Sequence, residues 1–342
     1  MLLRRPFSTN YRQKYSKNGT FVCNTNRSVK AYSALKLKED KVEFKNIGPP
    51  PKRYTMVEGQ SYDVYSTCAA IAIRGGSGGL VHGYGAKLIA PDSSQYSALS
   101  PFGKQLQEWS DVETFPRPKE LLEFYDLESN ADCKKVRESF AILDLDAKVF
   151  PCPKEGKTWR PRVKELGGKT HLPFLVDKNT GRSIYNGDDI VKYLFETYGN
   201  GQVPLSIQPG FKTSTSCNAA LILRFGRGGK AVPILRDNSA LKPITFWGYE
   251  LSPFSTLVRE VLSELELSYV QITPARGSKK RISFFQKHGN FQVPYIEDPN
   301  EGVCLFESAS IIKYLFDTYA LNPKKARGYP KNVAASTAAV TK

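Results

Sequence analysis

Ile190-Val-Lys-Tyr-Leu-Phe-Glu-Thr-Tyr198 recurs near the C-terminus as Ile311-Ile-Lys-Tyr-Leu-Phe-Asp-Thr-Tyr319. Seven of the nine positions are identical, and the other two are conservative exchanges. Similarity this close within one chain indicates an internal repeat, which has to be recognised before single elements are assigned. We therefore interpret the chain as two copies of one folding unit, each ending in a helix.

Two further matches extend the repeat toward the start of each unit. Leu172-Pro173-Phe174 corresponds to Val293-Pro294-Tyr295, and Val136-Arg-Glu corresponds to Val258-Arg-Glu. Leucines follow the second match in both copies, at 143 and 145 and at 265 and 267. Apolar residues at three- and four-residue steps predict an amphipathic helix whose apolar face a sheet can cover.

Each unit is predicted to follow the order β-α-β-α-β-β-α. The first strand spans 121–125 or 244–249, and the second spans 148–151 or 269–273. A helix crosses between these strands, so they can lie parallel, whereas the last two strands can pair as an antiparallel hairpin. Turn residues for the hairpins are Asn179-Thr180-Gly181 and Asn300-Glu301-Gly302. The predicted fold class is α/β, with a mixed four-stranded sheet in each unit.

Composition and the repeat divide the chain into six segments. We expect a basic leader at 1–50, a linker at 51–117, the first unit at 118–200, a second linker at 201–242, the second unit at 243–320 and a disordered tail at 321–342. Each linker carries a short apolar helix, at 69–74 and 219–224, followed by a glycine-rich stretch. Such a stretch is either a flexible linker or a phosphate-binding loop, although it lacks the strand-to-helix setting of the latter.

The formal net charge of +16 is concentrated at the front of the chain. Residues 1–38 contain nine Lys or Arg and no acid, and they lack the apolar core of a secretory signal. We expect an organellar transit peptide, for the chloroplast or alternatively the mitochondrion; a disordered basic tail is the other interpretation. We expect no transmembrane segment, because no stretch approaches roughly 18 apolar residues. The pattern of basic, aromatic, Cys and His residues predicts neither a nucleic-acid partner nor a metal site.

The chemistry of each unit depends on the point where its first strand meets its first helix. The free backbone N–H groups at such a helix start can stabilise a thiolate. Redox proteins that use a thiolate in this position carry Cys-Pro-x-Cys there. This chain has Asn130-Ala-Asp-Cys133 in the first unit and Ser252-Pro-Phe-Ser255 in the second. Dithiol exchange needs an attacking thiolate, so we do not expect a dithiol oxidoreductase. Cys133 is either a monothiol redox residue or buried and inert.

The second unit resembles the N-terminal domain of a serine-type glutathione transferase. Ser252-Pro-Phe, Val293-Pro294 and Glu307-Ser308 followed by Ile311 occur in that family's order and spacing. The first unit resembles the same family or a glutaredoxin. Together they resemble plant chloroplast proteins with two tandem thioredoxin-like domains of the glutathione transferase N-terminal type.

The resemblance implies a glutathione site in the second unit. The Ser252 hydroxyl would stabilise the glutathione thiolate, and Val293, before a cis-proline at Pro294, would pair its backbone with the cysteinyl part. Glu307 and Ser308 would hold the γ-glutamyl end, and the basic segment 279–281 would approach the glycine carboxylate. A competing interpretation needs no ligand: Ser252 caps its helix, with Pro253 in the first helical position, and Ser308 caps the last helix.

The first unit departs further from the family pattern. Its equivalent positions are Asn130, Cys133, Leu172 and Pro173, and Asn186-Gly187 stands where the second unit has Glu307-Ser308. Asp188 and Asp189 could partly replace the missing carboxylate.

The function expected from these residues is binding of glutathione or a related small thiol, with weak or no dithiol redox activity. About twenty residues follow Tyr319, too few for the helical domain that shapes the electrophile pocket of a full transferase. Transferase-like or peroxidase-like activity therefore needs a second wall, from the two repeats or from a partner subunit. The alternative is a non-catalytic organellar binding or scaffolding protein with a protein partner.

Overall fold

The computed structural model describes residues 42–52, 56–92, 95–331 and 333. Most of the expected transit peptide, and the end of the expected tail, lie outside the described residues. None of the described helices combines the length and the apolar composition that crossing a bilayer requires.

Both repeats have the predicted order of elements. The first consists of β4 (Leu122–Asp126), α2 (Ala131–Ile142), β5 (Ala147–Pro151), α3 (Arg160–Gly167), β6 (Phe174–Asp177), β7 (Arg182–Tyr185) and α4 (Gly187–Tyr198). The second consists of β8 (Ile244–Trp247), α6 (Pro253–Glu264), β9 (Tyr269–Ile272), α7 (Lys280–His288), β10 (Tyr295–Asp298), β11 (Val303–Phe306) and α8 (Ser308–Tyr319). Within each repeat the first two strands are parallel and the last two form an antiparallel hairpin.

The two sheets join edge to edge into one nine-stranded sheet, in the order β1-β11-β10-β8-β9-β5-β4-β6-β7. The junction is the antiparallel pair β5 and β9, in which Lys148 lies opposite Val270. These two residues hold equivalent positions in the two repeats, so each repeat uses the same edge and a pseudo-two-fold axis passes between the strands. The repeat pattern alone did not predict this packing.

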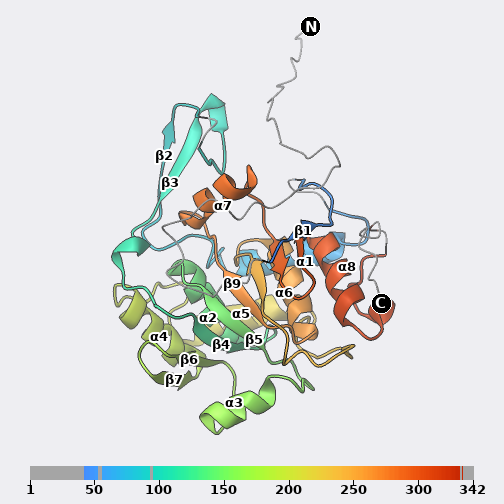
Figure 1. Ribbon diagram of the computed structural model, residues 1–342. Helices are drawn as coiled ribbons and strands as arrows, with labels where there is room; N and C mark the ends of the chain where they lie inside the picture. The colour runs from blue at the N-terminus through green and yellow to red at the C-terminus, as the bar shows by residue number, and fades with distance from the viewer. Residues whose placement is uncertain (1–41, 53–55, 93–94, 332, 334–342) are drawn as a thin grey trace.

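The helices form layers on the sheet (Figure 1). The large core cluster lies between the sheet and helices α2, α4, α6 and α8, and it includes Phe124 and Phe246. The opposite face carries two smaller clusters, one around Tyr125 under α3 and one around Tyr295 under α7. Alternation of Phe124 and Tyr125 between the two faces is what the two-residue period of a strand dictates.

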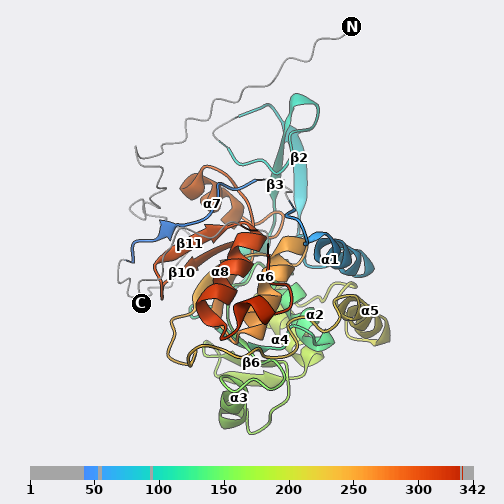
Figure 2. The same ribbon diagram turned by 90° about the vertical axis from the view of Figure 1, so that its right-hand side faces the viewer.

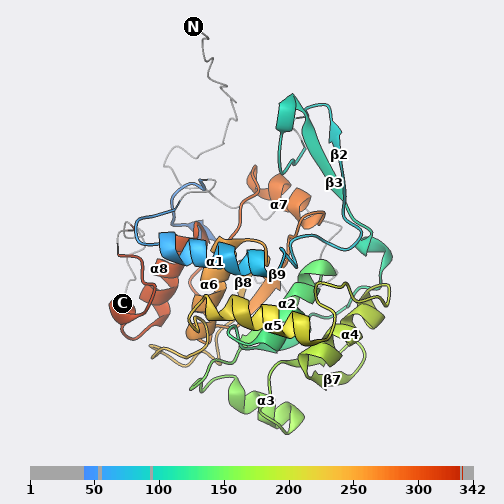
Figure 3. The same cartoon turned by 180° about the vertical axis from the view of Figure 1, so that it is seen from behind.

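Each linker packs on the repeat that does not follow it directly in the sequence. Helix α1 (Ser61–Ile73) of the first linker packs on α6 of the second repeat, and α5 (Phe211–Ile222) of the second linker packs on α2 of the first. The two helices lie side by side as an outer layer (Figure 3). Beyond each helix the chain bonds to the other repeat, since Val81 N donates to Arg276 O and Ala231 N donates to Lys154 O, both at 2.9 Å.

The glycine-rich stretches are close-packed turns, which corrects the expectation of a flexible linker and the alternative of a phosphate loop. Gly228 has a φ of +69°, and a Cβ there would lie 2.6 Å from the Cβ of Glu128. At the equivalent Gly78, a Cβ would lie 2.9 Å from the Cβ of Glu250. The side chains of Glu128 and Glu250 therefore occupy the space beside these turns that a phosphate would need.

Buried ion pairs fill the region between the linker helices and the repeats. Arg74 Nη2 lies 2.6 Å from Glu138 Oε2, and the equivalent Arg224 Nε lies 2.7 Å from Glu260 Oε1. Near the pseudo-two-fold axis, Arg259 bonds to carboxylates of both repeats, Glu128 at 2.7 Å and Glu250 at 2.9 Å. Charges buried in this way have to be paired, so the interface fixes the two repeats in one arrangement.

Parts of the expected leader and tail are ordered. Strand β1 (Lys45–Asn46) pairs parallel to β11 and forms one edge of the sheet. Within the expected tail, Leu321 N donates to Pro233 O at 2.9 Å and Tyr329 Oη donates to Asp317 at 2.9 Å. Backbone pairing and side-chain packing therefore extend beyond the 243–320 range on both sides.

A second sheet lies in the first linker, where no strand was predicted. Strands β2 (Gly85–Ile89) and β3 (Gln105–Trp109) form an antiparallel pair that projects from the body beside α7 (Figures 1 and 2). We call residues 85–109 the arm.

Candidate functional site

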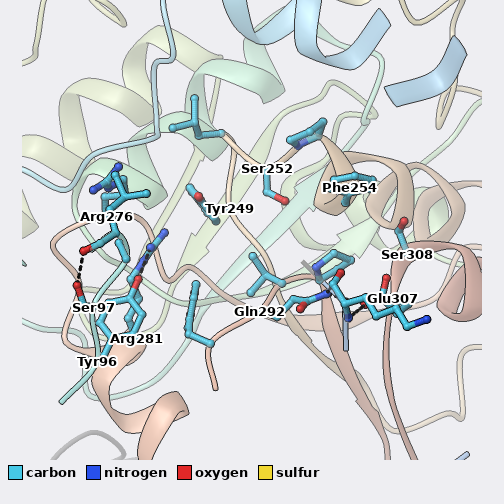
Figure 4. Close-up of a pocket in the computed structure, with 18 residues that line it drawn as sticks. Tyr96, Ser97, Tyr249, Ser252, Phe254, Arg276, Arg281, Gln292, Glu307 and Ser308 are labelled. Carbon is cyan, nitrogen blue, oxygen red and sulfur yellow. Dashed lines mark hydrogen bonds between the residues drawn. The ribbon is translucent and has the colours of Figure 1, made fainter. Parts of the chain in front are cut away.

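The site residues predicted in the second repeat line one cavity of about 360 Å³. It lies where the start of α6, the segment before β10 and the start of α8 converge (Figure 4). Its lining includes Ser252, Val293, Pro294, Glu307 and Ser308. These residues come from three separate parts of the repeat, and the thioredoxin-like fold brings them together.

Ser252 caps α6, with Pro253 as the first helical residue. Its hydroxyl accepts hydrogen bonds from Ser255 N at 3.2 Å and Ser255 Oγ at 2.9 Å. Ser252 is 7% exposed and lines the cavity. The capping interpretation is therefore correct for Ser252, and it does not exclude a contact with a ligand.

The bonds from Ser255 decide where the Ser252 proton points. A hydroxyl offers one donor and two acceptor positions. Ser255 is fully buried, and among the described residues its hydroxyl bonds only to Ser252. If Ser255 donates both its N–H and its O–H, the lone pairs of Ser252 are filled. The remaining O–H of Ser252 is then free to donate into the cavity.

Val293 lies two residues before the start of β10 at Tyr295. Its peptide bond to Pro294 is cis, as is the equivalent Leu172–Pro173 bond of the first repeat. Among the described residues, no backbone hydrogen bond engages Val293. Its main chain can therefore pair with an extended ligand.

Ser308 is the first residue of α8 and not its cap, which corrects the competing interpretation at this position. Glu307 is the cap residue, and its side chain makes no capping hydrogen bond to the first turn of α8. The Glu307 carboxylate accepts from Lys52 N and from Gln292 Nε2, both at 2.6 Å. The unbonded N–H groups of a helix start favour an anion, and the neighbouring carboxylate favours a cation.

Arg281 lies at the far end of the cavity from Glu307 (Figure 4). Only 4% of it is exposed, and its guanidinium packs against the rings of Phe291, Tyr249 and Tyr96 at 4.5, 5.0 and 6.0 Å. Its Nη1 donates to Tyr96 Oη at 2.7 Å, whereas Nη2 has no hydrogen-bond partner.

No carboxylate pairs with Arg281 among the described residues. Burial lowers the pKa of Arg281, but Tyr249 and Tyr96 outweigh it and hold the pKa above its ordinary value. An unpaired buried cation is costly and marks a place for an anion. The other two residues of the basic segment are already engaged: Lys279 pairs with Glu113, and Lys280 lies 2.7 Å from Asp146.

The equivalent site in the first repeat is filled by its own side chains. Asn130 Oδ1 accepts from the backbone of Asp132 and Cys133 at 2.8 and 2.9 Å. A Cβ at Gly187 would lie 2.7 Å from Asp132 Cβ, so α4 packs directly on the first turn of α2. Lys135 bonds to Asp132 and Asp188. Asp188 was expected to replace Glu307 in part, but its carboxylate is already paired with Lys135. Leu172 and Pro173 retain only the backbone geometry.

Cys133 is fully buried, which favours the inert of its two interpretations. Its Sγ accepts from Leu127 N at 3.3 Å. Burial, reinforced by the Asp126 carboxylate, raises the pKa of the thiol well above its ordinary value. A protonated sulfur without access to substrate cannot act as a nucleophile.

The arm and the N-terminal segment supply cavity residues that sequence reasoning missed. Residues Tyr96–Leu99 of the arm and Lys52 are part of the cavity lining. Neither segment belongs to the repeat, so its periodicity could not reveal them. Both segments therefore contribute a second wall to the cavity.

Comparison with known proteins agrees with the tandem arrangement of the two repeats. The family model "Glutathione S-transferase, N-terminal domain" matches residues 124–202 and again residues 246–323. The glutathione S-transferase-like protein OpS6 of Beauveria bassiana is 32% identical over 81 residues, which span 24% of this chain and 37% of the length of that relative. No solved structure matches the chain. The chain therefore contains two tandem thioredoxin-like domains that match the glutathione S-transferase N-terminal domain family.

Proposed function

We propose that the cavity of the second repeat binds glutathione, or a related γ-glutamyl thiol, and holds its sulfur at Ser252. The observation that carries this proposal is the order of groups along the cavity. Ser252 lies between the unpaired cation Arg281 and the uncapped start of α8 beside Glu307 (Figure 4).

This order matches the charges of glutathione. The glycine carboxylate would pair with Arg281, the cation in the cavity lining that has no carboxylate partner among the described residues. The γ-glutamyl carboxylate would lie at the N-terminus of α8 beside Ser308, and the ammonium group would lie by Glu307. The cysteinyl backbone would pair with Val293.

Stabilisation of the thiolate is the chemical step that this geometry supports. The N-terminus of α6 carries a partial positive charge, and the Ser252 hydroxyl donates to the sulfur. Both effects lower the pKa of a bound thiol, which raises the thiolate fraction at neutral pH. Transferase-like or peroxidase-like activity follows from a thiol that the ligand supplies. The first repeat, whose site is filled, acts as a scaffold in this proposal.

Calorimetric titration tests the proposal. Wild type is titrated with glutathione and with the glutathione analogue whose glycine carboxylate is an amide. We expect wild type to prefer the carboxylate by about tenfold, as a charge-assisted hydrogen bond gives. Arg281→Met is expected to lose this preference, and Ser252→Ala to weaken binding of both ligands.

Asn130→Ala is the matched control, because it removes the equivalent helix cap in the first repeat. It should destabilise the fold about as much as Ser252→Ala and leave the affinity for glutathione unchanged. Absence of binding heat in folded wild type would rule out the proposed function.

A further inference from the structure

A short N-terminal segment runs along the edge of the second repeat and ends at the cavity. We call residues 45–52 the strap. Its first two residues form β1, which pairs parallel to β11, and Lys45 N donates to Gly302 O at 2.9 Å. Its last residue, Lys52, lines the cavity. The family matches begin at residues 124 and 246, so the strap lies outside both matched domains.

Two features of the strap set its course between β1 and Lys52. Ile47 is buried in the large core cluster, and a Cβ at Gly48 would lie 2.6 Å from Leu305 Cδ2, so the backbone packs closely on β11. Residues 49–51 are all proline. Consecutive prolines favour an extended, semi-rigid chain and have no backbone N–H. The next backbone N–H after Gly48 therefore belongs to Lys52, at the cavity.

Lys52 bonds to the end of the cavity that would hold the γ-glutamyl group. Its backbone N–H donates to Glu307 Oε1 at 2.6 Å, and its carbonyl accepts from Gln292 Nε2 at 3.0 Å. Gln292 Nε2 also donates to Glu307 Oε1 at 2.6 Å, which closes the set of hydrogen bonds (Figure 4). Glu307 Oε1 thus has both lone pairs filled by the chain itself. A ligand gains a bond to this oxygen only in exchange for one of them.

The first repeat has no counterpart of the strap. Strand β7 is the equivalent of β11, and in the part of the chain that the structure describes it forms the free edge of the nine-stranded sheet. Asn186, which stands at the position of Glu307, accepts from Asp188 N at 2.9 Å. The strap therefore accompanies the repeat with the open cavity, and the repeat whose site is filled does without it. This placement favours a role at the cavity over a role in the fold that both repeats share.

We propose that the strap is an autoinhibitory contact, in which the Lys52 backbone competes with the γ-glutamyl end of glutathione for Glu307 and Gln292. This inference rests on the proposed function. In the free protein the Lys52 N–H holds Glu307 Oε1, and in the complex the ligand ammonium takes its place. Because the free protein gives up bonds that it already has, the strap lowers the affinity. The glycine end of the ligand is unaffected, since Arg281 lies at the far end of the cavity (Figure 4).

Calorimetry on the full chain tests the competition with glutathione and with L-cysteinylglycine, which lacks the γ-glutamyl residue. Lys52→Pro removes the competing N–H from a segment that already holds three prolines. We expect this variant to bind glutathione about tenfold more tightly than wild type, as the loss of one competing hydrogen bond to a charged group gives. Its affinity for L-cysteinylglycine should equal that of wild type. Lys52→Ala, which retains the N–H, should not show the gain.

Lys119→Pro is the matched control. Lys119 also follows a proline, and its N–H donates to a side-chain oxygen, Asn179 Oδ1, at 2.8 Å. This bond lies in the first repeat, away from the cavity. The substitution therefore removes a similar hydrogen bond and should leave the affinity for both ligands as in wild type.

Amide hydrogen exchange of wild type gives a second measurement that needs no variant. The bond to Glu307 protects the Lys52 amide in the free protein. Saturation with glutathione should make this amide exchange faster, whereas L-cysteinylglycine should leave its exchange rate unchanged.

Several results would overturn the inference. If Lys52→Pro binds glutathione no more tightly than wild type, or if glutathione slows exchange of the Lys52 amide, the strap does not compete and the glutathione site stands. If Lys52→Ala gains as much affinity as Lys52→Pro, the effect comes from the lysine side chain and not from the backbone contact. An equal gain for L-cysteinylglycine would place the effect outside the γ-glutamyl end. If neither wild type nor Lys52→Pro binds glutathione when folded, the proposed function fails as well.

Discussion

The first helix of each repeat is capped by a polar side chain, Asn130 in the first and Ser252 in the second, but the surroundings of the two caps differ. Asn130 accepts two backbone hydrogen bonds, and its neighbourhood is closed by Asp132, Lys135 and Gly187. Ser252 caps the equivalent helix and still lines an open cavity. Two hydrogen bonds from Ser255 to Ser252 would fill both lone pairs of the Ser252 hydroxyl and leave its proton for a ligand.

The first prediction concerns Ser255 as a positioning residue. In Ser255→Ala, the Ser252 hydroxyl loses one donor and can turn away from the sulfur, so we expect the pKa of bound glutathione thiol to rise by about one unit. Ultraviolet absorbance of the thiolate against pH measures this value. Ser139→Ala removes another buried helical hydroxyl, which bonds to Lys135 O in the first repeat, and should not change it. An unchanged thiol pKa in Ser255→Ala would show that Ser255 acts only in packing.

The second prediction concerns thiol accessibility. Cys68 is exposed on α1, whereas Cys133 is buried with a raised pKa. In the folded protein we expect Cys68→Ser to remove a thiol that reacts rapidly with a disulfide reagent, and Cys133→Ser to leave the rapid phase unchanged. Reaction of both cysteines in denaturant is the control. A rapid phase that disappears in Cys133→Ser would restore a redox role for that sulfur.

At the scale of elements, the sequence predicted what local patterns encode. The order of strands and helices and the hairpin turns follow from periodicity and turn residues, and the structure confirms them. Helices also cover most of the apolar stretches predicted at 69–74 and 219–224, but α1 and α5 begin at Ser61 and Phe211, well before them. The strands of the arm were not predicted, because they are short and no tight-turn signature joins them. The filling of the first site escaped too, because the Lys135–Asp188 contact joins two helices that are distant in sequence.

Each terminal helix is joined to its hairpin by a buried carboxylate, which gives the third prediction. Asp177 accepts from Tyr193 Oη and Tyr198 Oη, both at 2.5 Å. Burial raises the pKa of Asp177, but these hydrogen bonds outweigh it and hold the pKa below its ordinary value. Its contribution to stability is therefore present above the unfolded pKa of about 3.9, and is lost as pH falls through the folded pKa.

Asp177→Asn is expected to lower the free energy of unfolding at pH 7 and to differ less from wild type as pH falls below about 4. Urea unfolding across this range measures the difference. Asp189→Asn, which removes an exposed carboxylate from α4, should show no such convergence. A wild-type advantage that stays constant down to the acid limit would contradict the assigned role of Asp177.

The fourth prediction concerns the attachment of the linker helices. Arg74 at the end of α1 bonds to Glu138 of α2 through Nε at 3.0 Å and Nη2 at 2.6 Å, and both side chains are buried. Arg74→Met leaves the Glu138 carboxylate without its main partner and should cost about 3–5 kcal/mol of unfolding free energy. The double variant Arg74→Met with Glu138→Met should recover much of that loss in denaturant titration. If the double variant is as unstable as the sum of the two single variants, the pair does not act as a unit.

For the whole molecule, the joining of the two repeats was beyond sequence reasoning. Pairing of β5 with β9 depends on which strand edges meet after each unit has formed, and nothing local to either strand specifies it. Exchange of the linker helices adds a second set of contacts across the same axis, and the bonds of Arg259 to Glu128 and Glu250 add a third. Separate domains on a flexible linker would have none of these.

Three sets of contacts across one axis imply that the repeats unfold together, which is the last prediction. The three tryptophans lie in different parts: Trp109 in the arm, Trp159 in the first repeat and Trp247 in the second. With Trp109 replaced by Phe, variants that keep only Trp159 or only Trp247 place one reporter in each repeat, and Trp159 also senses the junction because its Nε1 donates to Glu266 O at 2.9 Å. We expect their fluorescence transitions in urea to coincide in midpoint and slope, as for a single cooperative unit.

Arg259→Met tests the coupling directly. It removes a cation that bonds to both repeats and leaves the core of each repeat intact. If the buried ion pairs couple the repeats, this substitution should lower both midpoints or separate them. If the two midpoints already differ without it, the continuous sheet does not make one folding unit, and the first repeat would be an independent domain rather than the scaffold of the second.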